Sequence, residues 1–183
     1  AGPEEMPLTL PWNKLRHPLT DVLYSYRASR TLFRPYQFKP ILKMMNGFDH
    51  RILIADEVGL GKTIEAGLVW SELQGRSSMQ RVLVVCPSSL TLKWQTEMRR
   101  RFDRRLDNLD AAAWERFLLD YEGGQQEPLL GVVSMERLRM LTHVMERIID
   151  LGVRFDLVII DETHRMRNPG NRTHEMGETL ASA

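Results

Sequence analysis

The sequence predicts an α/β fold, in which a mainly parallel β-sheet carries helices on both faces. Short apolar runs alternate with longer segments of helical spacing, which is the pattern of such a sheet. One run leads into a glycine-rich turn that ends in Gly61-Lys62-Thr63, and a later run ends in the acids Asp161 and Glu162. Because ligand sites of parallel sheets lie beyond the carboxyl ends of the strands, both features fall where chemistry is expected.

The first part of the chain is predicted to lead into this fold. Four of the nine prolines lie within residues 1–20, which indicates an extended segment. Residues 21–30 fit a short helix. Pro35 is suited to the first turn of a second helix, which reaches Met45.

Strands and helices then alternate. The predicted strands are 51–55, 81–86, 129–133 and 156–160. The predicted helices are 62–73, 89–101, about 111–120, 135–150 and one that begins near residue 171. We expect Gly75 to end the first of these helices, Ser88 or Ser89 to cap the second, and residues 123–126 to be flexible.

The turn before residue 62 has the sequence form of a phosphate-binding loop. The first turn of a helix has unpaired N–H groups and a partial positive charge, so it holds phosphate oxygens. Gly59 and Gly61 let the backbone approach the phosphates, Lys62 supplies a charge to the β- and γ-phosphates, and the Thr63 hydroxyl helps to ligate Mg²⁺. Asp56 departs from the general motif, which has glycine there. The alternative is a glycine-rich turn with a solvated lysine.

The acid pair supplies the second half of the predicted site. Asp161 is expected to hold Mg²⁺ through water, and Glu162 to orient and deprotonate an attacking water. A helix N-cap followed by a first-turn acid is the alternative for this pair alone. A phosphate loop followed by an acidic strand end is the order that a nucleotide hydrolase needs, so the two motifs support each other.

Composition excludes several other classes. With 183 residues, 43% apolar and 27% charged, the chain fits a globular domain. Its longest apolar runs are far shorter than the roughly 20 residues that span a bilayer. The single cysteine, Cys86, excludes a disulfide framework and is expected to be a core thiol, and the five histidines have no metal-ligand spacing.

Together these motifs resemble the Swi/Snf family of superfamily-two helicase-like ATPases, and most closely its bacterial RapA-type branch. Residues 56–67 resemble motif I, which carries an acid at the position of Asp56. Residues 84–90 with Trp94-Gln95 resemble motif Ia, residues 132–136 resemble the strand before motif II, and residues 161–168 match its DEAH-like motif II. The resemblance covers the first RecA-like lobe, residues 31–183, after a lead-in at 1–30.

The resemblance implies a P-loop NTPase lobe that uses ATP and Mg²⁺. Catalysis is assigned to Lys62, Asp161 and Glu162, Mg²⁺ ligation to Thr63 and Asp161, and coupling of nucleotide state to the motor to His164. Gln37, in Arg34-Pro35-Tyr36-Gln37, is implied to contact the adenine. The implied nucleotide-binding residues are Gln37, Asp56, Gly59, Leu60, Gly61, Lys62, Thr63 and Ile64.

In the family, motif III and a second RecA-like lobe with an arginine finger follow motif II. We therefore expect this chain to be an incomplete lobe, with a gap in its sheet and little activity alone. The whole motor would move along duplex DNA or remodel protein–DNA complexes in the bacterial cytoplasm, associated with the nucleoid. One alternative is an RNA-polymerase-recycling or RNA-directed ATPase, and another is a non-catalytic nucleotide- or nucleic-acid-binding module.

Residues 99–105 form the densest basic run. Arg99, Arg100, Arg101 and Arg104 are candidates for contacts with nucleic-acid phosphates. A solvated helix end, where the dipole favours cations, is an equal alternative. Trp94 and Trp114 are expected to be buried rather than stacked on bases, and Met44, Met45, Met135, Met140 and Met145 to fill the core.

Overall fold

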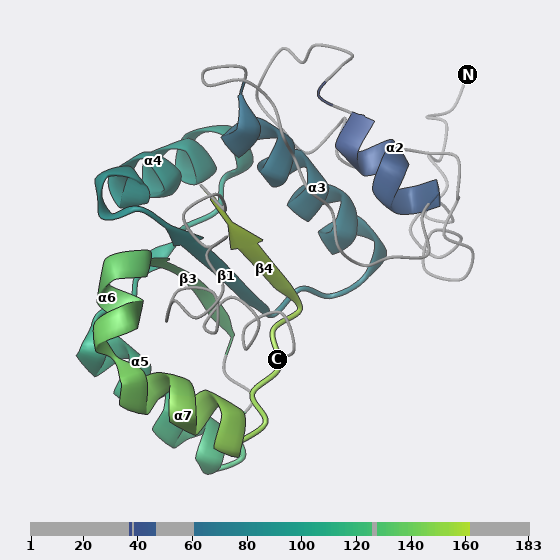
Figure 1. The fold of residues 1–183 in the computed structure, drawn as a ribbon. Helices are drawn as coiled ribbons and strands as arrows, with labels where there is room; N and C mark the ends of the chain where they lie inside the picture. Colours follow the sequence, from purple (N-terminus) through teal and green to yellow (C-terminus); the bar gives the residue numbers. More distant parts are fainter. Residues whose placement is uncertain (1–36, 38, 47–60, 126–127, 162–183) are drawn as a thin grey trace, which may run out of the picture.

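The computed structural model describes residues 37, 39–46, 61–125 and 128–161. They form a four-stranded sheet with helices on both faces, so the predicted α/β class is confirmed (Figure 1). The order is β2-β3-β1-β4, and every pairing is parallel. The strands are β1 (Arg81–Cys86), β2 (Asp107–Asn108), β3 (Leu129–Ser134) and β4 (Leu157–Ile160).

The core has two halves, one on each face of the sheet, and alternate side chains of β1 point into one half or the other. Val82, Val84 and Cys86 pack beneath α2 (Lys39–Asn46), α3 (Lys62–Arg76) and α4 (Thr91–Phe102). Leu83 and Val85 pack on the opposite side, beneath α5 (Ala111–Glu122), α6 (Met135–Met140) and α7 (Thr142–Asp150). All five side chains are fully buried, because strand side chains alternate between faces and both faces are covered.

Asp156 fixes the amino-terminal edge of the sheet. Its Oδ2 accepts hydrogen bonds from the backbone N–H groups of Gln80, at 2.7 Å, and Arg81, at 2.8 Å. The Asp156 N–H in turn donates to the Arg81 carbonyl. One side chain thereby aligns the starts of β1 and β4, which sets the register Val82 to Leu157.

Several predicted element boundaries need correction. The predicted helix 135–150 is two helices, broken at Leu141, whose φ of −95° and ψ of 55° are not helical. The helix that starts at Lys62 runs past Gly75 to Arg76, and no serine side chain caps α4, which follows a 3₁₀ turn over Ser88–Leu90. The two-residue strand β2 was not predicted.

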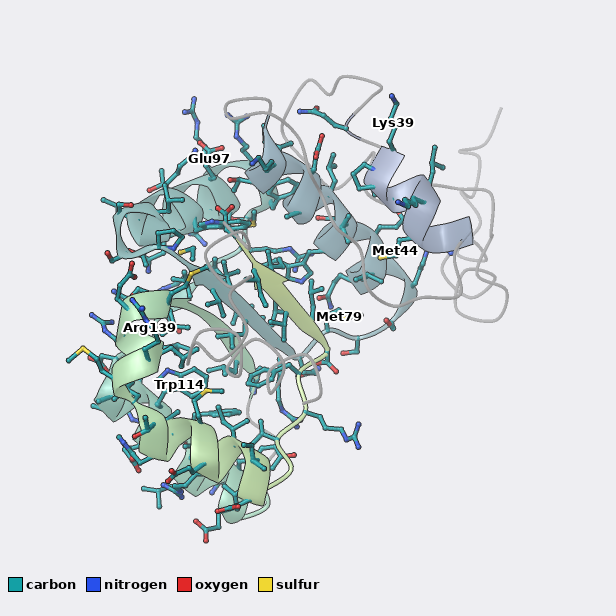
Figure 2. All side chains as sticks on the ribbon, in the orientation of Figure 1. Lys39, Met44, Met79, Glu97, Trp114 and Arg139 are labelled. Carbon is teal, nitrogen blue, oxygen red and sulfur yellow. The ribbon has the colours of Figure 1, made fainter. Side chains whose placement is uncertain are left out.

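Both tryptophans and the cysteine expected in the core are buried, whereas the methionines differ from one another. Trp94, Trp114 and Cys86 are buried, and Trp114 lies inside the layer between the sheet and the helices in Figure 2. Met135 is buried, Met44 and Met145 are partly buried, and the side chain of Met45 lies outside the described residues. Met140 was expected in the core but is 81% exposed, because it belongs to the last turn of α6 on the side that faces away from the sheet.

Other predictions fall outside the described residues: the lead-in helix, the strand at 51–55 and the last helix. None of the helices within the described ranges is both long enough and apolar enough to cross a membrane.

Candidate nucleotide-binding site

Gly61 and the start of α3 are the described part of the predicted phosphate loop. Gly61 has a φ of 99°, in the left-handed region that glycine adopts without steric cost. Its carbonyl accepts the N–H groups of Ile64 at 2.7 Å and Glu65 at 3.0 Å, which begins the helix at Lys62. A helix that starts in this way directs its first N–H groups outward as an anion-binding end.

This end of α3 points toward the carboxyl side of the sheet. Only residues 77–80 connect the last turn of α3 to the first residue of β1, so the helix ends at the amino side of the strands. Figure 1 shows α3 running back across the sheet from the side toward which the strand arrows point. Lys62 and Thr63 therefore lie at the side where β1, β3 and β4 end.

Gln37 packs against the phosphate-loop turn. The side chain is 6% exposed, and its Nε2 lies 3.1 Å from the position that a Cβ would take on Gly61. A side chain at residue 61 would therefore fill the space beside the Gln37 amide. The structure brings these two predicted residues together although they are far apart in the sequence.

Asp161 is held at the end of β4 by two neighbours. Its backbone N–H donates to the Val85 carbonyl at 2.8 Å, and its Oδ2 accepts a hydrogen bond from Nε1 of Trp94 at 3.0 Å. Sequence reasoning predicted that Trp94 is buried but did not predict this bond. The bond joins α4 to the acid predicted to hold the metal ion.

Further polar groups surround the strand ends. Burial raises the pKa of the Cys86 thiol to about 12, with additional contributions from the negative charges of Asp161 and Glu136. Cys86 is therefore a neutral thiol at physiological pH and is no nucleophile. Glu136 accepts the backbone N–H of Ser88 at 3.0 Å, which ties the turn after β1 to the helix after β3. Sequence reasoning gave Glu136 no such role.

The arginine run does not share one environment. Arg99 and Arg100 are exposed, although Arg99 lies 3.6 Å from Asp103. Arg101 pairs with Glu97 one turn earlier.

Arg104 lies over the Trp70 ring, with its guanidinium carbon 4.5 Å from the ring centre, and burial lowers its pKa. Arg99 and Arg100 also line a shallow groove with Gln95, Thr96, Arg105 and Leu106. Among the four arginines predicted to contact phosphate, Arg99 and Arg100 are therefore the exposed ones, and Arg105 of the same run is exposed as well.

Other predicted site residues lie outside the described ranges: Asp56, Gly59, Leu60, Glu162 and His164. No cluster of three His, Cys, Asp or Glu side chains suited to a metal ion occurs among the residues described. This donor set still suits Mg²⁺, which usually takes only one or two protein carboxylates, with water and substrate phosphates completing its shell. The glycine turn, Lys62, Thr63 and Asp161 fit a magnesium nucleotide.

The described fold is a parallel α/β lobe, with the predicted nucleotide site at the carboxyl side of its sheet. The family described as SNF2-related domain matches residues 39–183, and the chain belongs to this family. RNA polymerase-associated protein RapA from Yersinia pestis (strain Pestoides F) is 34% identical over 177 residues, which is 94% of this chain and 17% of that protein. RapA from Proteus mirabilis (strain HI4320) is 32% identical over 162 residues, 86% of this chain and 16% of that protein.

A solved structure shares the fold. The Sulfolobus solfataricus SWI2/SNF2 ATPase core in complex with dsDNA aligns with a TM-score of 0.64 and 24% identity, over 84% of this chain and 31% of that one. The chain spans about a sixth of the length of the curated relatives it matches.

Proposed function

We propose that this chain is the first RecA-like, ATP-binding lobe of a nucleic-acid-dependent ATPase of Swi/Snf helicase type, with residues 1–30 as its lead-in. The observation that carries the proposal is the start of α3 at Gly61, facing the side of the sheet where Trp94 holds Asp161. Membership of the SNF2-related family supports the same function.

Each site residue is assigned one task. The first turn of α3 and Lys62 bind the β- and γ-phosphates, while Thr63 and Asp161 hold Mg²⁺. When bound, the metal ion neutralises charge that develops on the phosphates. Gln37 contacts the adenine, and Glu162 accepts the proton of the attacking water. Gly59, Leu60 and Ile64 shape the loop, Asp56 precedes it, and His164 couples the nucleotide to the rest of the motor.

Duplex DNA is the proposed track, and a second RecA-like lobe of the same protein is the proposed partner that completes the site. A structural neighbour is described in complex with dsDNA, which favours DNA over RNA. A more specific candidate is remodelling of a DNA-bound RNA polymerase, because the similar curated proteins are named RNA polymerase-associated. We place this activity in the bacterial cytoplasm, at the nucleoid.

Two substitutions in the full-length protein test the assignment. Lys62→Ala removes the charge that faces the phosphates, so calorimetry should detect a sharp loss of Mg·ATP affinity with little change in thermal stability. Glu162→Gln keeps size and hydrogen bonding but removes the base, so ATP should still bind while DNA-stimulated phosphate release falls by roughly 10²–10⁴. Equal ATP affinity of Lys62→Ala and the unaltered protein would refute the phosphate-loop assignment.

A further inference from the structure

The bond between Trp94 and Asp161 joins residues 67 positions apart at the predicted metal site. The indole is 2% exposed and its Nε1 lies 3.0 Å from Oδ2 of Asp161. An indole N–H can only donate, so it fixes which face of the carboxylate is turned toward α4. A hydrogen bond to an ionised acceptor is also about twice as strong as a neutral one.

Trp94 is itself held in place along α4. Trp94, Met98 and Phe102 recur at intervals of four residues and are all buried, so they form the inward face of the helix. At the far end, the Arg104 N–H donates to the Met98 carbonyl at 3.1 Å and closes the last turn.

The same helix also contacts α3. A Cβ on Gly67 would collide with the Phe102 ring, so this ring of α4 packs directly against the backbone of α3. Arg104 adds a second contact by lying over Trp70. Helix α4 thus meets the strand that ends in Asp161 at one end, and the helix that carries Lys62 at the other.

We propose that Trp94 is a positioning residue that orients the Asp161 carboxylate for Mg²⁺, and that α4 thereby sets the acid relative to the phosphate helix. This inference rests on the proposed function. Losing a partner that orients a metal ligand typically costs about 10–100-fold in metal affinity or activity. Loss of the indole N–H bond should therefore weaken Mg-dependent nucleotide binding by about 10-fold.

The test uses Trp94→Phe in the full-length protein and the non-hydrolysable analogue AMP-PNP. Calorimetry gives the analogue's dissociation constant in MgCl₂ and in EDTA. We expect the affinity in MgCl₂ to fall by about 10-fold and the affinity in EDTA to stay unchanged.

Trp114→Phe is the matched control. Trp114 is also fully buried, it lies on the opposite face of the sheet, and its Nε1 has no hydrogen-bond partner among the described residues. The control removes the same indole volume without removing a bond to a carboxylate. Both variants should lose similar stability, but only Trp94→Phe should lose Mg-dependent affinity.

A double-mutant cycle shows whether the effect passes through the acid. In an Asp161→Asn background, Trp94→Phe should cause no further loss of affinity in MgCl₂, because the two changes act on one interaction.

Three outcomes would overturn the inference while leaving the proposed function intact. The first is a Trp94→Phe protein whose affinity for AMP-PNP in MgCl₂ stays within twofold of that of the unaltered protein. The second is an equal loss of this affinity in Trp114→Phe. The third is a full additional loss when Trp94→Phe is added to Asp161→Asn. Absence of any Mg-dependent AMP-PNP binding by the unaltered protein would overturn the proposed function and this inference together.

Discussion

Arg100 and Arg104 lie four residues apart in one basic run, yet their surroundings differ. Arg100 is exposed on the last turn of α4, where its charge also favours the helix end. Arg104 follows Asp103, whose backbone lies in the left-handed region of φ and ψ. This conformation turns the chain back, so that the Arg104 guanidinium lies over the Trp70 ring. The sequence alone does not show which arginine is exposed and which is packed, because the difference depends on the backbone conformation of Asp103.

This difference gives opposite expectations for two single substitutions. If Arg100 contacts DNA phosphate, Arg100→Ala should weaken DNA binding and reduce the slope of log K against log salt by about 0.9, without loss of stability. Arg104→Ala should lower the free energy of unfolding by about 0.5–2 kcal/mol, since the desolvated contact with Trp70 is lost. Salt titrations of DNA affinity and denaturant unfolding measure the two effects. An unchanged salt slope in Arg100→Ala would make this arginine part of a solvated helix end.

Gly67 offers a second test at the scale of one residue. Gly67→Ala introduces a methyl group against the Phe102 ring and should lower the free energy of unfolding by roughly 1–3 kcal/mol. Gly75→Ala is the control in the same helix: the position is exposed, so the higher helix propensity of alanine should stabilise the protein by up to about 1 kcal/mol. Denaturant unfolding measures both. Adding Phe102→Leu should recover part of the loss in Gly67→Ala, and no recovery would argue against the collision as its cause.

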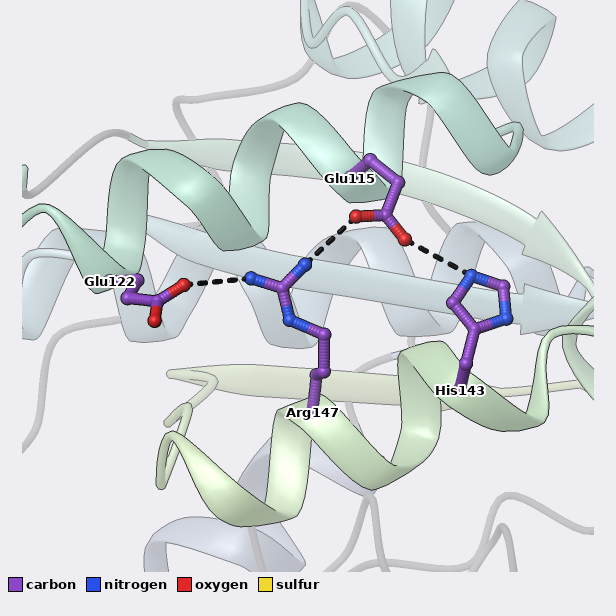
Figure 3. Close-up of polar contacts among 4 residues, drawn as sticks. All are labelled: Glu115, Glu122, His143 and Arg147. Carbon is purple, nitrogen blue, oxygen red and sulfur yellow. Dashed lines mark hydrogen bonds and ion pairs between the residues drawn. The ribbon is translucent and has the colours of Figure 1, made fainter.

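At the scale of elements, α5 and α7 are joined by a charged network on their outer surface (Figure 3). Arg147 of α7 reaches Glu115 at 2.8 Å and Glu122 at 2.9 Å, both on α5. His143 lies 3.1 Å from the other oxygen of Glu115. One arginine thus bridges two acids that stand about two helical turns apart, so it fixes the alignment of the helices as well as their distance.

Arg147→Ala should lower the free energy of unfolding by about 1 kcal/mol, near the upper end for exposed ion pairs because one cation serves two carboxylates. Most of this difference should vanish in high salt, which screens exposed charges. Arg139→Ala is the control, because Arg139 of α6 is exposed and points away from the body of the protein in Figure 2. Equal losses for the two variants in low salt would show that the network does not stabilise the pair of helices.

The elements also show where sequence patterns are sufficient. β1 and β4 were predicted almost to the residue, because each is an uninterrupted apolar run, which is typical of a parallel strand with helices on both faces. The β1 side chains from Val82 onward are buried, whereas those of β4 are partly buried. The break at Leu141 was missed because both flanking segments have helical spacing. In one straight helix, Leu138 and Val144 would point roughly 120° apart, so the break is what buries both against one core.

The end of α3 and the presence of β2 also differ from the prediction, and each difference has a local cause. Helix α3 continues past Gly75 because Arg76 bonds with the buried Glu72 at 2.8–2.9 Å and extends the last turn. β2 has only two residues and exists because Leu109 bonds to Val132 beside it, a partner that is distant in sequence. In the site, the family resemblance implied that Gln37 and Gly61 both bind nucleotide but not that they lie side by side, and the bond from Trp94 to Asp161 depends on the angle at which α4 crosses the sheet.

At the scale of the whole molecule, the described sheet runs from β2 to β4, and β4 is its last described strand. The proposed function needs a cation aimed at the γ-phosphate, and an arginine finger typically contributes about 10³–10⁵ in rate. The family places that arginine in a second lobe. A polypeptide of residues 1–183 should therefore bind Mg·ATP weakly and show no DNA-stimulated turnover, as measured by phosphate release. DNA-stimulated release by the purified monomer, abolished by Glu162→Gln, would contradict this expectation.

The strand order has a consequence for synthesis of the protein on the ribosome. β1 lies between β3 and β4, and both of these partners are encoded after it. With 43 residues from Cys86 to Leu129, translation at about 5–20 residues per second separates β1 from β3 by roughly 2–9 s. During this interval the apolar segment Arg81–Cys86 leaves the ribosome before the residues of β3 and β4 have been synthesised. A nascent chain of this kind has a time window in which a holding chaperone protects it, and slow codons between β1 and β3 would lengthen that window.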